Sequence, residues 1–487
     1  MGIDISDSGL LRTGAYIDGQ WVDADDGSTY DVSNPANGEV IAAVARCGQA
    51  ETNRAIRAAE KALSSWRETT VKGRAGLLRR WFDLMMAAQA DLALILTSEQ
   101  GKPLAEAMGE IAYGANYIEW FAEECKRVYG DVIPAPGNDK RIVVIRQPVG
   151  VVCCITPWNF PNAMLTRKIA PALAAGCTVV CKPASTTPLS AFAIVELAER
   201  AGIPAGVINI VSGRTSEIGA EMTSNPTVRK LTFTGSTQVG KKLMAECAHT
   251  VKRTSMELGG NAPFIVFDDA DLDAAIKGAI ICKFRNAGQT CVCANRFLIQ
   301  ENIYDEFSER LAAAVAEFKL GDGTADGVTM GPLITEGAAD VVVSFIDDAL
   351  ANGATATVGG GRSDLGVRFI EPTILTNVND DMRVFREEIF GPVAPLFKFK
   401  TEQEAIAMAN DTEFGLACYF YTRDIGRIWR VGEALEYGIV GINEGLISNE
   451  MAPFGGVKES GQGREGSKYG MDDYLEMKYM CMGGIDS

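Results

Sequence analysis

The sequence has a single histidine, His249, among its 487 residues. A histidine-rich zinc site is therefore excluded, no metal is expected, and a cysteine–histidine catalytic pair has only one candidate. His249 follows a stretch with helical spacing, and a surface position without a chemical role is expected for it. The sequence also lacks an apolar run of about 18 residues, so neither a transmembrane helix nor a membrane partner is expected.

Basic residues are in the minority, because 46 Lys and Arg stand against 63 Asp and Glu and the formal net charge is −17. Such a charge repels phosphate backbones, so a nucleic acid is not an expected partner, and an anionic ligand must meet a local basic cluster. The 12 cysteines are sparse, and most of them lie in apolar stretches, as small hydrophobic residues do. This usage argues against a disulfide framework and favours a cytoplasmic location, where thiols stay reduced.

From about residue 150 the sequence alternates between short apolar, β-branched runs and stretches with helical spacing. The predicted strands are 151–156, 177–182, 207–211, 228–234, 264–267 and 296–300. The predicted helices are 162–175, 189–201, 272–284, 304–318 and one that begins at residue 237. The rhythm is that of parallel sheets covered by helices, so the expected fold class is α/β, with two doubly wound, Rossmann-like domains.

Two further β-rich pieces are expected to form a small projecting arm. Residues 129–147 contain Pro134, Pro136 and Gly137 between two β-rich stretches, which predicts a hairpin. The tail at 474–482 is also strand-like, and such arms often pair between subunits. A homodimer or homotetramer is therefore expected.

The segment that begins with Gly235 and Ser236 follows a predicted strand and opens a helix. It is similar to a P-loop, but Lys242 stands where a P-loop needs Ser or Thr, which argues against an NTPase. Two interpretations stay open: backbone amides that face the phosphates of a dinucleotide, or a plain tight turn.

Residues 286–293 form a predicted loop between a helix and a strand, and this loop presents the candidate nucleophile Cys291. A thiolate adds readily and reversibly to an aldehyde carbon, although a cysteine taken alone is more often structural. Glu257 ends a predicted strand, where its carboxylate could activate water or simply face solvent. Asn159 lies in a rigid turn between two prolines, and its amide could donate to an oxyanion or only form the turn.

Two arginines are tethered close to these groups. Arg167 lies eight residues after Asn159, which is about two helical turns, and Arg285 lies six residues before Cys291. A structural ion pair is a sufficient explanation for either arginine alone. Together they could clamp a substrate carboxylate at the end opposite the aldehyde.

At this point the sequence resembles the aldehyde dehydrogenase superfamily over almost its whole length. The motifs that carry the resemblance are Pro157-Trp158-Asn159-Phe160-Pro161, Lys182-Pro183-Ala184, Phe233-Thr234-Gly235-Ser236, Glu257-Leu258-Gly259-Gly260, Gly288-Gln289-Thr290-Cys291, Glu388-Ile389-Phe390-Gly391-Pro392 and Pro453-Phe454-Gly455-Gly456, in the family's order. The domains that it implies are a cofactor domain at 1–128 and 148–257, a catalytic domain at 258–455 and an oligomerisation arm at 129–147 and 468–487. It further implies that Cys291 is the nucleophile, Glu257 the general base and Asn159 an oxyanion donor together with the Cys291 backbone N–H.

The resemblance also implies an NAD(P) cofactor. The positions that it assigns to cofactor binding are Thr156, Trp158, Lys182, Ser185, Gly235, Ser236, Leu258, Glu388 and Phe390. Many NAD-using relatives carry Glu at the position of Ser185, and that carboxylate would repel a 2′-phosphate. Serine removes the charge and leaves Lys182 free to pair with phosphate, so NADP is expected to be favoured over NAD.

Further segments resemble the succinate-semialdehyde dehydrogenase branch: Thr166-Arg167-Lys168, Lys283-Phe284-Arg285-Asn286, Gly445-Leu446-Ile447-Ser448 and Gly466-Ser467-Lys468-Tyr469-Gly470. In that branch Arg167, Arg285 and Ser448 would bind the carboxylate of the small aldehyde substrate. Glutarate semialdehyde stays open, because one extra CH₂ changes binding by only about 1 kcal/mol. Cys293 also resembles this branch, in which some members use such a cysteine pair as an oxidation switch, and a packing role is the alternative.

A cysteine-dependent acyl hydrolase is the main competing class, because it too would present a thiol and an oxyanion donor. It would turn over esters or amides without a cofactor, and the single histidine argues against it. A non-catalytic protein on the same scaffold would be expected to lack Cys291 or Glu257, and both are present.

Overall fold

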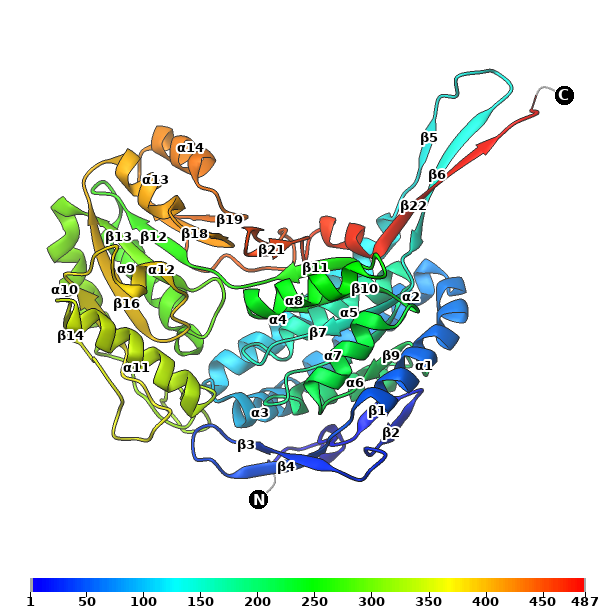
Figure 1. The fold of residues 1–487 in the computed structure, drawn as a ribbon, viewed down its shortest axis with the longest axis horizontal. Coiled ribbons are helices and arrows are strands. Elements are labelled where there is room, and N and C mark those ends of the chain that lie inside the picture. Colours follow the sequence, from blue (N-terminus) through cyan, green and yellow to red (C-terminus); the bar gives the residue numbers. More distant parts are fainter. Residues whose placement is uncertain (1–2, 486–487) are drawn as a thin grey trace.

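The computed structural model describes residues 3–485, so residues 1–2 and 486–487, the outer ends of the expected cofactor domain and arm, lie outside it. Two helix-covered sheets form the two halves of the body, and a three-stranded ribbon projects from it (Figure 1). The expected α/β class is confirmed. Among the described residues, none of the helices is both long enough and apolar enough to cross a bilayer.

The first sheet has eight strands. In sheet order they are β2 (Gln20–Val22), β1 (Ala15–Ile17), β9 (Ile208–Ile210), β8 (Thr178–Lys182), β7 (Val151–Ile155), β10 (Val228–Thr234), β11 (Arg253–Glu257) and β21 (Gly461–Gln462). The strands from β9 to β11 run parallel, and antiparallel strands close both edges. Every residue of β7 and β8 is buried, as expected for strands covered on both faces.

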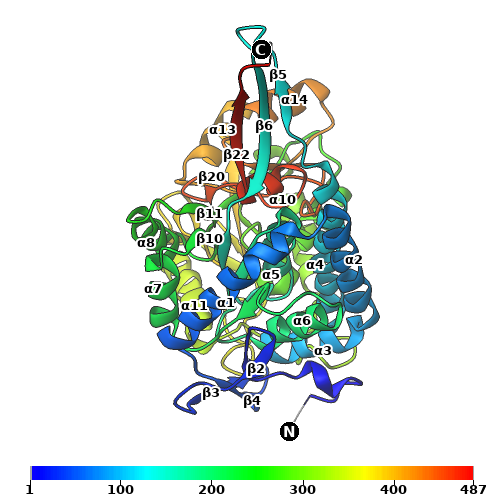
Figure 2. The same ribbon diagram turned by 90° about the vertical axis from the view of Figure 1, so that its right-hand side faces the viewer.

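Helices pack on both sides of this sheet (Figures 1 and 2). They are α1 (Gln49–Glu68), α2 (Val71–Ala87), α3 (Gln89–Gln100), α4 (Leu104–Glu124), α5 (Ala163–Ala175), α6 (Leu189–Arg200), α7 (Thr215–Ser224) and α8 (Thr237–Ala248). Helix α5 is buried along its whole length, which its alanine-rich sequence permits. It ends at Gly176, whose φ of 96° gives the left-handed cap that glycine adopts without steric cost.

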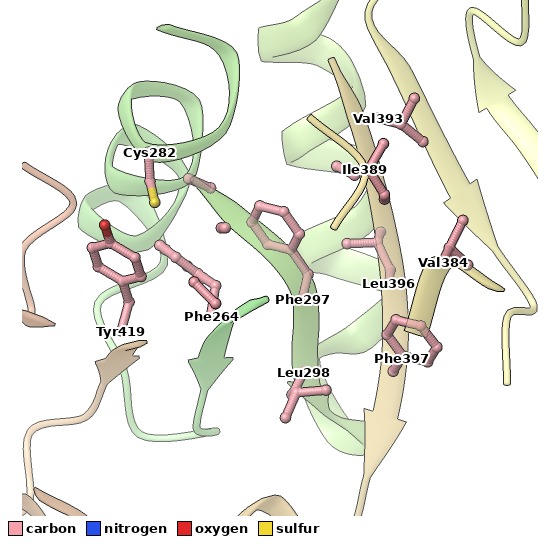
Figure 3. Close-up of a cluster of buried hydrophobic side chains, with 14 of the residues drawn as sticks. Phe264, Cys282, Phe297, Leu298, Val384, Ile389, Val393, Leu396, Phe397 and Tyr419 are labelled. Atoms are coloured by element: carbon pink, nitrogen blue, oxygen red, sulfur yellow. The ribbon is translucent and has the colours of Figure 1, made fainter. Parts of the chain in front are cut away.

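The second sheet has seven strands. In sheet order they are β14 (Thr355–Val358), β15 (Thr373–Thr376), β16 (Val393–Phe399), β13 (Ala294–Gln300), β12 (Ala262–Val266), β18 (Ala417–Tyr421) and β19 (Ile439–Ile442). Its helices are α9 (Leu272–Phe284), α10 (Tyr304–Val315), α11 (Glu336–Ala351), α12 (Arg383–Arg386), α13 (Glu402–Asn410) and α14 (Ile425–Ala434). Figure 3 shows its aromatic core, in which the rings of Phe264 and Phe297 lie 5.1 Å apart.

The predicted hairpin and tail together make the projecting ribbon. Strands β5 (Asp131–Ile133) and β6 (Arg141–Pro148) form the hairpin, and β22 (Leu475–Met482) pairs antiparallel with β6 along its whole length. Both views show this arm leaving the body (Figures 1 and 2). Two further pairs are short: β3 (Thr29–Ser33) with β4 (Val40–Ala45), and β17 (Phe414–Gly415) with β20 (Val457–Lys458).

The predicted elements are confirmed, with shifts at their ends. Strand β10 and helix α9 have the predicted bounds. The helix predicted for 304–318 ends earlier, at Val315, because the backbone turns there and the Phe318 amide donates to the Val315 carbonyl. Sequence patterns did not indicate β21, a two-residue strand near the C-terminus that returns to the first sheet.

Candidate active site

Three neighbouring parallel strands of the first sheet, β7, β10 and β11, end at the same edge. The turn with Asn159 follows β7, Gly235 follows β10, and Glu257 is the last residue of β11. This edge meets the Cys291 loop of the second sheet closely, because a Cβ atom at Gly260 would lie 2.5 Å from the Cys291 carbonyl oxygen. The predicted groups therefore converge where α/β proteins place their ligands.

A cleft of about 1140 Å³ opens along this edge. Among its lining residues are six of the predicted cofactor positions: Thr156, Trp158, Lys182, Ser185, Gly235 and Ser236. A second cavity, of about 240 Å³, shares Trp158, Gly235 and Ser236 with it and is lined by the other three: Leu258, Glu388 and Phe390. Asn159 and Cys291 line this second cavity as well. The two cavities form one groove that leads to the thiol.

The groove has the polar groups that a dinucleotide requires. Helix α8 begins after Ser236, whose side chain does not cap it, so its first amides are available to phosphate oxygens. The Thr156 hydroxyl is buried and has no hydrogen-bond partner among residues 3–485. Burial lowers the pKa of Lys182 to about 8, and its ammonium donates only a 3.3 Å bond to the Pro183 carbonyl. These groups fit an NAD(P) cofactor.

The Cys291 loop is shaped by an unusual turn. The 3-10 segment Arg285–Gly288 contains two residues in the left-handed region, Asn286 and Ala287, each with φ of 53°. This conformation is rare for residues other than glycine, and surrounding contacts must maintain it. The turn brings Cys291, which is partly exposed, to the wall of the groove.

The surroundings of Cys291 favour the neutral thiol. Burial raises the pKa of Cys291 to about 12, and the Glu388 carboxyl adds to the shift, whereas Arg167 opposes it. The lone histidine, His249, is exposed at the end of α8. The structure therefore provides no histidine to deprotonate the thiol.

Asn159 lies beside Cys291 in the second cavity. Its Nδ2 atom donates one hydrogen bond to the Gln289 carbonyl at 3.1 Å. An amide nitrogen carries two hydrogens, so the other is available for an oxygen bound next to the sulfur. This geometry suits the oxyanion role expected for Asn159.

Glu257 is buried but lines neither of the two cavities. Burial, and after it the negative Glu465, raise the pKa of Glu257 well above its usual value, while Arg167 and Lys168 oppose the shift. Its Oε2 atom has no hydrogen-bond partner among the described residues. The carboxyl thus lies outside the two cavities, but it is close enough to Cys291 to help raise the pKa of that thiol.

The three residues predicted to bind a substrate carboxylate lie together. Arg167, Arg285 and Ser448 line one small cavity with Cys291, together with Tyr113, Phe160, Met164, Thr290, Val292 and Phe454. Its volume of about 20 Å³ is room for about one water molecule. A carboxylated aldehyde that reaches Cys291 must therefore move these side chains apart.

The two arginines differ in their partners. The Arg167 Nε atom lies 2.8 Å from Glu465 Oε2, and Lys168 Nζ lies 2.5 Å from the other oxygen of the same carboxylate. Arg285 has no ion pair among residues 3–485, and its guanidinium lies 5.3 Å from the Phe160 ring. Arg285 is consequently the cation that is freer to meet an anion.

The structure gives Cys293 a packing contact. Its side chain is 8% exposed, and its thiol donates to the Lys283 carbonyl at 3.3 Å. The bond directs the sulfur toward α9. Cys291 and Cys293 are both free thiols.

Sequence reasoning missed several buried polar residues that organise the site, including Glu465, Lys102 and Glu110. Arg167 and Lys168 are adjacent cations in an apolar helix, and this pattern could have signalled a buried acid partner. The identity of that acid was not readable, because Glu465 lies 297 residues away from Lys168 in the chain.

Comparisons with known proteins agree with this geometry. The sequence model of the aldehyde dehydrogenase family matches residues 21–480. The chain is 62% identical over 483 residues to a glutarate-semialdehyde dehydrogenase of Pseudomonas aeruginosa, with 99% of this chain and 100% of that protein covered. It is 61% identical over 479 residues to the succinate-semialdehyde dehydrogenase [NADP(+)] GabD of Escherichia coli, with 98% and 99% covered.

A solved structure is equally similar. The crystal structure of an Escherichia coli NADP-dependent enzyme matches with a TM-score of 0.98 and 61% identity, and the match covers 99% of this chain and 100% of that one. The sequence match therefore agrees with three features of the structure: the shared fold, the groove that suits a dinucleotide, and the thiol at the end of that groove. The chain belongs to the aldehyde dehydrogenase family, whose members oxidise aldehydes with NAD or NADP.

Proposed function

We propose that this protein oxidises succinate semialdehyde to succinate through a thiohemiacetal and a thioester on Cys291. The observation that carries the proposal is the cavity that Arg167, Arg285 and Ser448 share with Cys291. A short substrate with an aldehyde at one end and a carboxylate at the other can reach the sulfur and the guanidinium groups at once. The names of the relatives in Pseudomonas aeruginosa and Escherichia coli support a carboxylated aldehyde.

In the proposed mechanism Cys291 loses its proton and its sulfur attacks the aldehyde carbon. The Asn159 Nδ2 atom and the Cys291 backbone N–H donate to the oxygen that becomes negative, and one such donor is typically worth about 3 kcal/mol. The nicotinamide, when bound, supplies a hydride acceptor. Glu257 then turns toward the thioester and takes a proton from the water that hydrolyses it.

We propose that the nine groove residues hold the cofactor and that NADP is preferred. Ser185 places no negative charge in the cleft, and the Lys182 ammonium lacks an ion-pair partner among residues 3–485. A 2′-phosphate can occupy that position without repulsion from a carboxylate at residue 185. Replacement Ser185→Glu is expected to raise the KM for NADP at least tenfold more than that for NAD, and equal changes would contradict the proposal.

Glutarate semialdehyde is the alternative substrate. One methylene changes binding by only about 1 kcal/mol, and the side chains around the small cavity must move for either compound. The relative in Pseudomonas aeruginosa carries this substrate in its name.

We further propose the domain roles. Residues 1–128 and 148–257 bind the cofactor, residues 258–455 carry the nucleophile, and residues 129–147 and 468–487 join subunits into a homodimer or homotetramer. The free thiols fit a reducing cytoplasm. Cys293 is assigned a packing role, because an oxidation switch requires its thiol to leave the Lys283 carbonyl first.

A steady-state panel tests substrate and cofactor together. It contains semialdehydes of three to six carbons and matched neutral aldehydes, each with NAD and with NADP. We expect the highest kcat/KM for succinate semialdehyde with NADP, and no oxidation by Cys291→Ala although that variant still binds cofactor. Robust turnover by Cys291→Ala, or hydrolysis of esters by an enzyme that oxidises no aldehyde in the panel, would overturn the proposed chemistry.

A further inference from the structure

A segment with several buried polar side chains connects the two halves of the active site. It runs from Gln100, the last residue of α3, to Glu110 in the second turn of α4. Glu106 and Glu110 lie one turn apart on the same face of α4. The Lys102 side chain, next to them, is 0% exposed and forms an ion pair with Glu110 at 2.6 Å.

One end of this segment fixes the turn that carries Asn159. The Lys102 ammonium donates to the Asn159 carbonyl at 2.8 Å. The other oxygen of Glu110 accepts from the backbone amides of Asn162 and Ala163, at 3.0 and 3.2 Å, where α5 begins. The turn is therefore bound on both sides of Pro161.

The other end fixes the loop that carries Cys291. Glu106 accepts from the Asn286 amide at 2.8 Å, and Gln100 Nε2 donates to the Asn286 side-chain oxygen at 2.9 Å. Asn286 Nδ2 in turn donates to the Asn159 carbonyl at 3.0 Å. These bonds account for the left-handed conformation of Asn286, and they link the loop directly to the Asn159 turn.

A fully buried ion pair is weak evidence for stability, because apolar side chains of similar size often stabilise a core equally well. The Lys102–Glu110 pair instead makes three hydrogen bonds to the backbone of the turn and of the start of α5. The Asn159 side chain of that turn lines the same cavity as Cys291. Amide donors act on an oxyanion only when they are placed accurately, and a displacement of about 1 Å costs about 100-fold in rate.

We propose that Lys102, with Glu110, is a positioning residue that sets the Asn159 amide against the oxygen of the Cys291 adduct. This inference rests on the proposed role of Asn159. Lys102 touches neither substrate nor cofactor and acts through the carbonyl that it binds.

The test uses the charge-balanced variant Lys102→Met/Glu110→Gln, which removes both charges of the ion pair together and keeps an acceptor for the α5 amides. The rate constant for reduced-cofactor formation in a single turnover should fall about 10- to 100-fold. The KM for aldehyde and the Kd for NADP should change less than twofold, because the Asn159 donor acts in the transition state. Lys230→Met is the matched control, because Lys230 is equally buried in β10 and donates to Ser255, away from the groove.

A double-mutant cycle with Asn159→Ala separates the possible outcomes. If Lys102 acts through Asn159, adding Lys102→Met/Glu110→Gln to Asn159→Ala should lower the single-turnover rate constant by less than a further threefold. Any of three results would overturn the positioning role. The rate losses of Asn159→Ala and of the paired variant multiply in full, the paired variant keeps the wild-type rate, or Lys230→Met loses as much rate as the paired variant. An Asn159→Ala enzyme as fast as wild type would instead overturn the oxyanion role in the proposed function, and the positioning role with it.

Discussion

The charge balance around Cys291 differs between its two sides. The groove side holds the partly buried Glu388, which accepts from the Gly260 amide at 3.1 Å and whose pKa is raised by desolvation to about 7. On the other side two cations, Arg167 and Lys168, share the single carboxylate of Glu465. The Glu388 carboxyl therefore disfavours ionisation of the Cys291 thiol, whereas the positive charge on the other side favours it.

The raised pKa of Cys291 gives a prediction about its reactivity without cofactor. A thiol whose pKa is about 12 remains mostly protonated up to pH 10, so the thiolate fraction rises about tenfold for each pH unit. The rate of inactivation by iodoacetamide should rise with this slope from pH 7 to pH 10. A plateau below pH 9 would show that the thiol ionises more easily than the structure indicates, and peptide mapping confirms that Cys291 is the modified residue.

The arginines of the small cavity should have separable effects. Arg285 has no ion-pair partner among the described residues, so Arg285→Ala should lower kcat/KM for succinate semialdehyde about 10- to 100-fold more than for butanal. Arg167→Ala removes a cation of the clamp and a partner of Glu465 together, so it should impair both aldehydes, and succinate semialdehyde more than butanal. Arg285→Lys is the control, since it retains the charge and loses the bidentate geometry. If neither alanine variant changes the preference over butanal, the carboxylate clamp is wrong.

At the scale of elements, the Arg285–Gly288 turn decides where the nucleophile lies. Gly288 has a φ of 75°, and a Cβ atom there would overlap the Gly391 carbonyl. Gly288→Ala should therefore lower the thermal midpoint and reduce kcat strongly, because the loop must shift. Gly327→Ala is the matched control: its φ is 77° and nothing lies within 4 Å, so it should cost only about 1 kcal/mol and leave kcat unchanged. Equal effects of the two substitutions would contradict a role of packing at Gly288.

Elements with a strong local pattern were predictable from the sequence. Strand β10 is buried except at Arg229, and α9 starts at the cap Asp271, so local residues alone define both. Strand β21 was not predictable, because two residues carry no pattern and only its partner β11 makes it a strand.

The candidate site, too, was predictable only where local pattern or sheet topology defines it. Sheet topology predicts that the ends of β7, β10 and β11 meet, and the residues predicted there, apart from Glu257, line a common groove. The roles assigned to Lys182, Glu388 and Ser448 came from resemblance rather than from spacing. The raised pKa of Glu257 depends in part on Glu465, which packing between distant segments brings near it.

At the scale of the molecule, an acidic protein is proposed to bind an anion. The net charge of −17 repels a carboxylate at long range, but surface charges are screened beyond about 8 Å at physiological salt. The local cluster of Arg167, Lys168, Arg285 and Glu465 has an excess of positive charge. The buried cluster is screened less than the surface, so it dominates once the substrate has entered the cavity.

The arm leads to a prediction about assembly. A ribbon of three strands that leaves the body exposes both faces, and such a ribbon is only marginally stable alone. Met477 and Tyr479 point to one face of β22 and are 73% and 63% exposed, so a second copy of the chain is expected to cover them. Met477→Asp/Tyr479→Asp should shift the mass measured by light scattering toward that of the monomer.

The matched control is Leu365→Asp/Val367→Asp, which places the same charges on two exposed apolar residues of the other half of the molecule. That variant should keep the wild-type mass, because no strand edge projects there. Since each subunit contains its own groove and its own Cys291, a dissociated variant should keep the wild-type Kd for NADP and lose thermal stability. An unchanged mass in the β22 variant, or dissociation of the control, would show that the arm does not join the subunits.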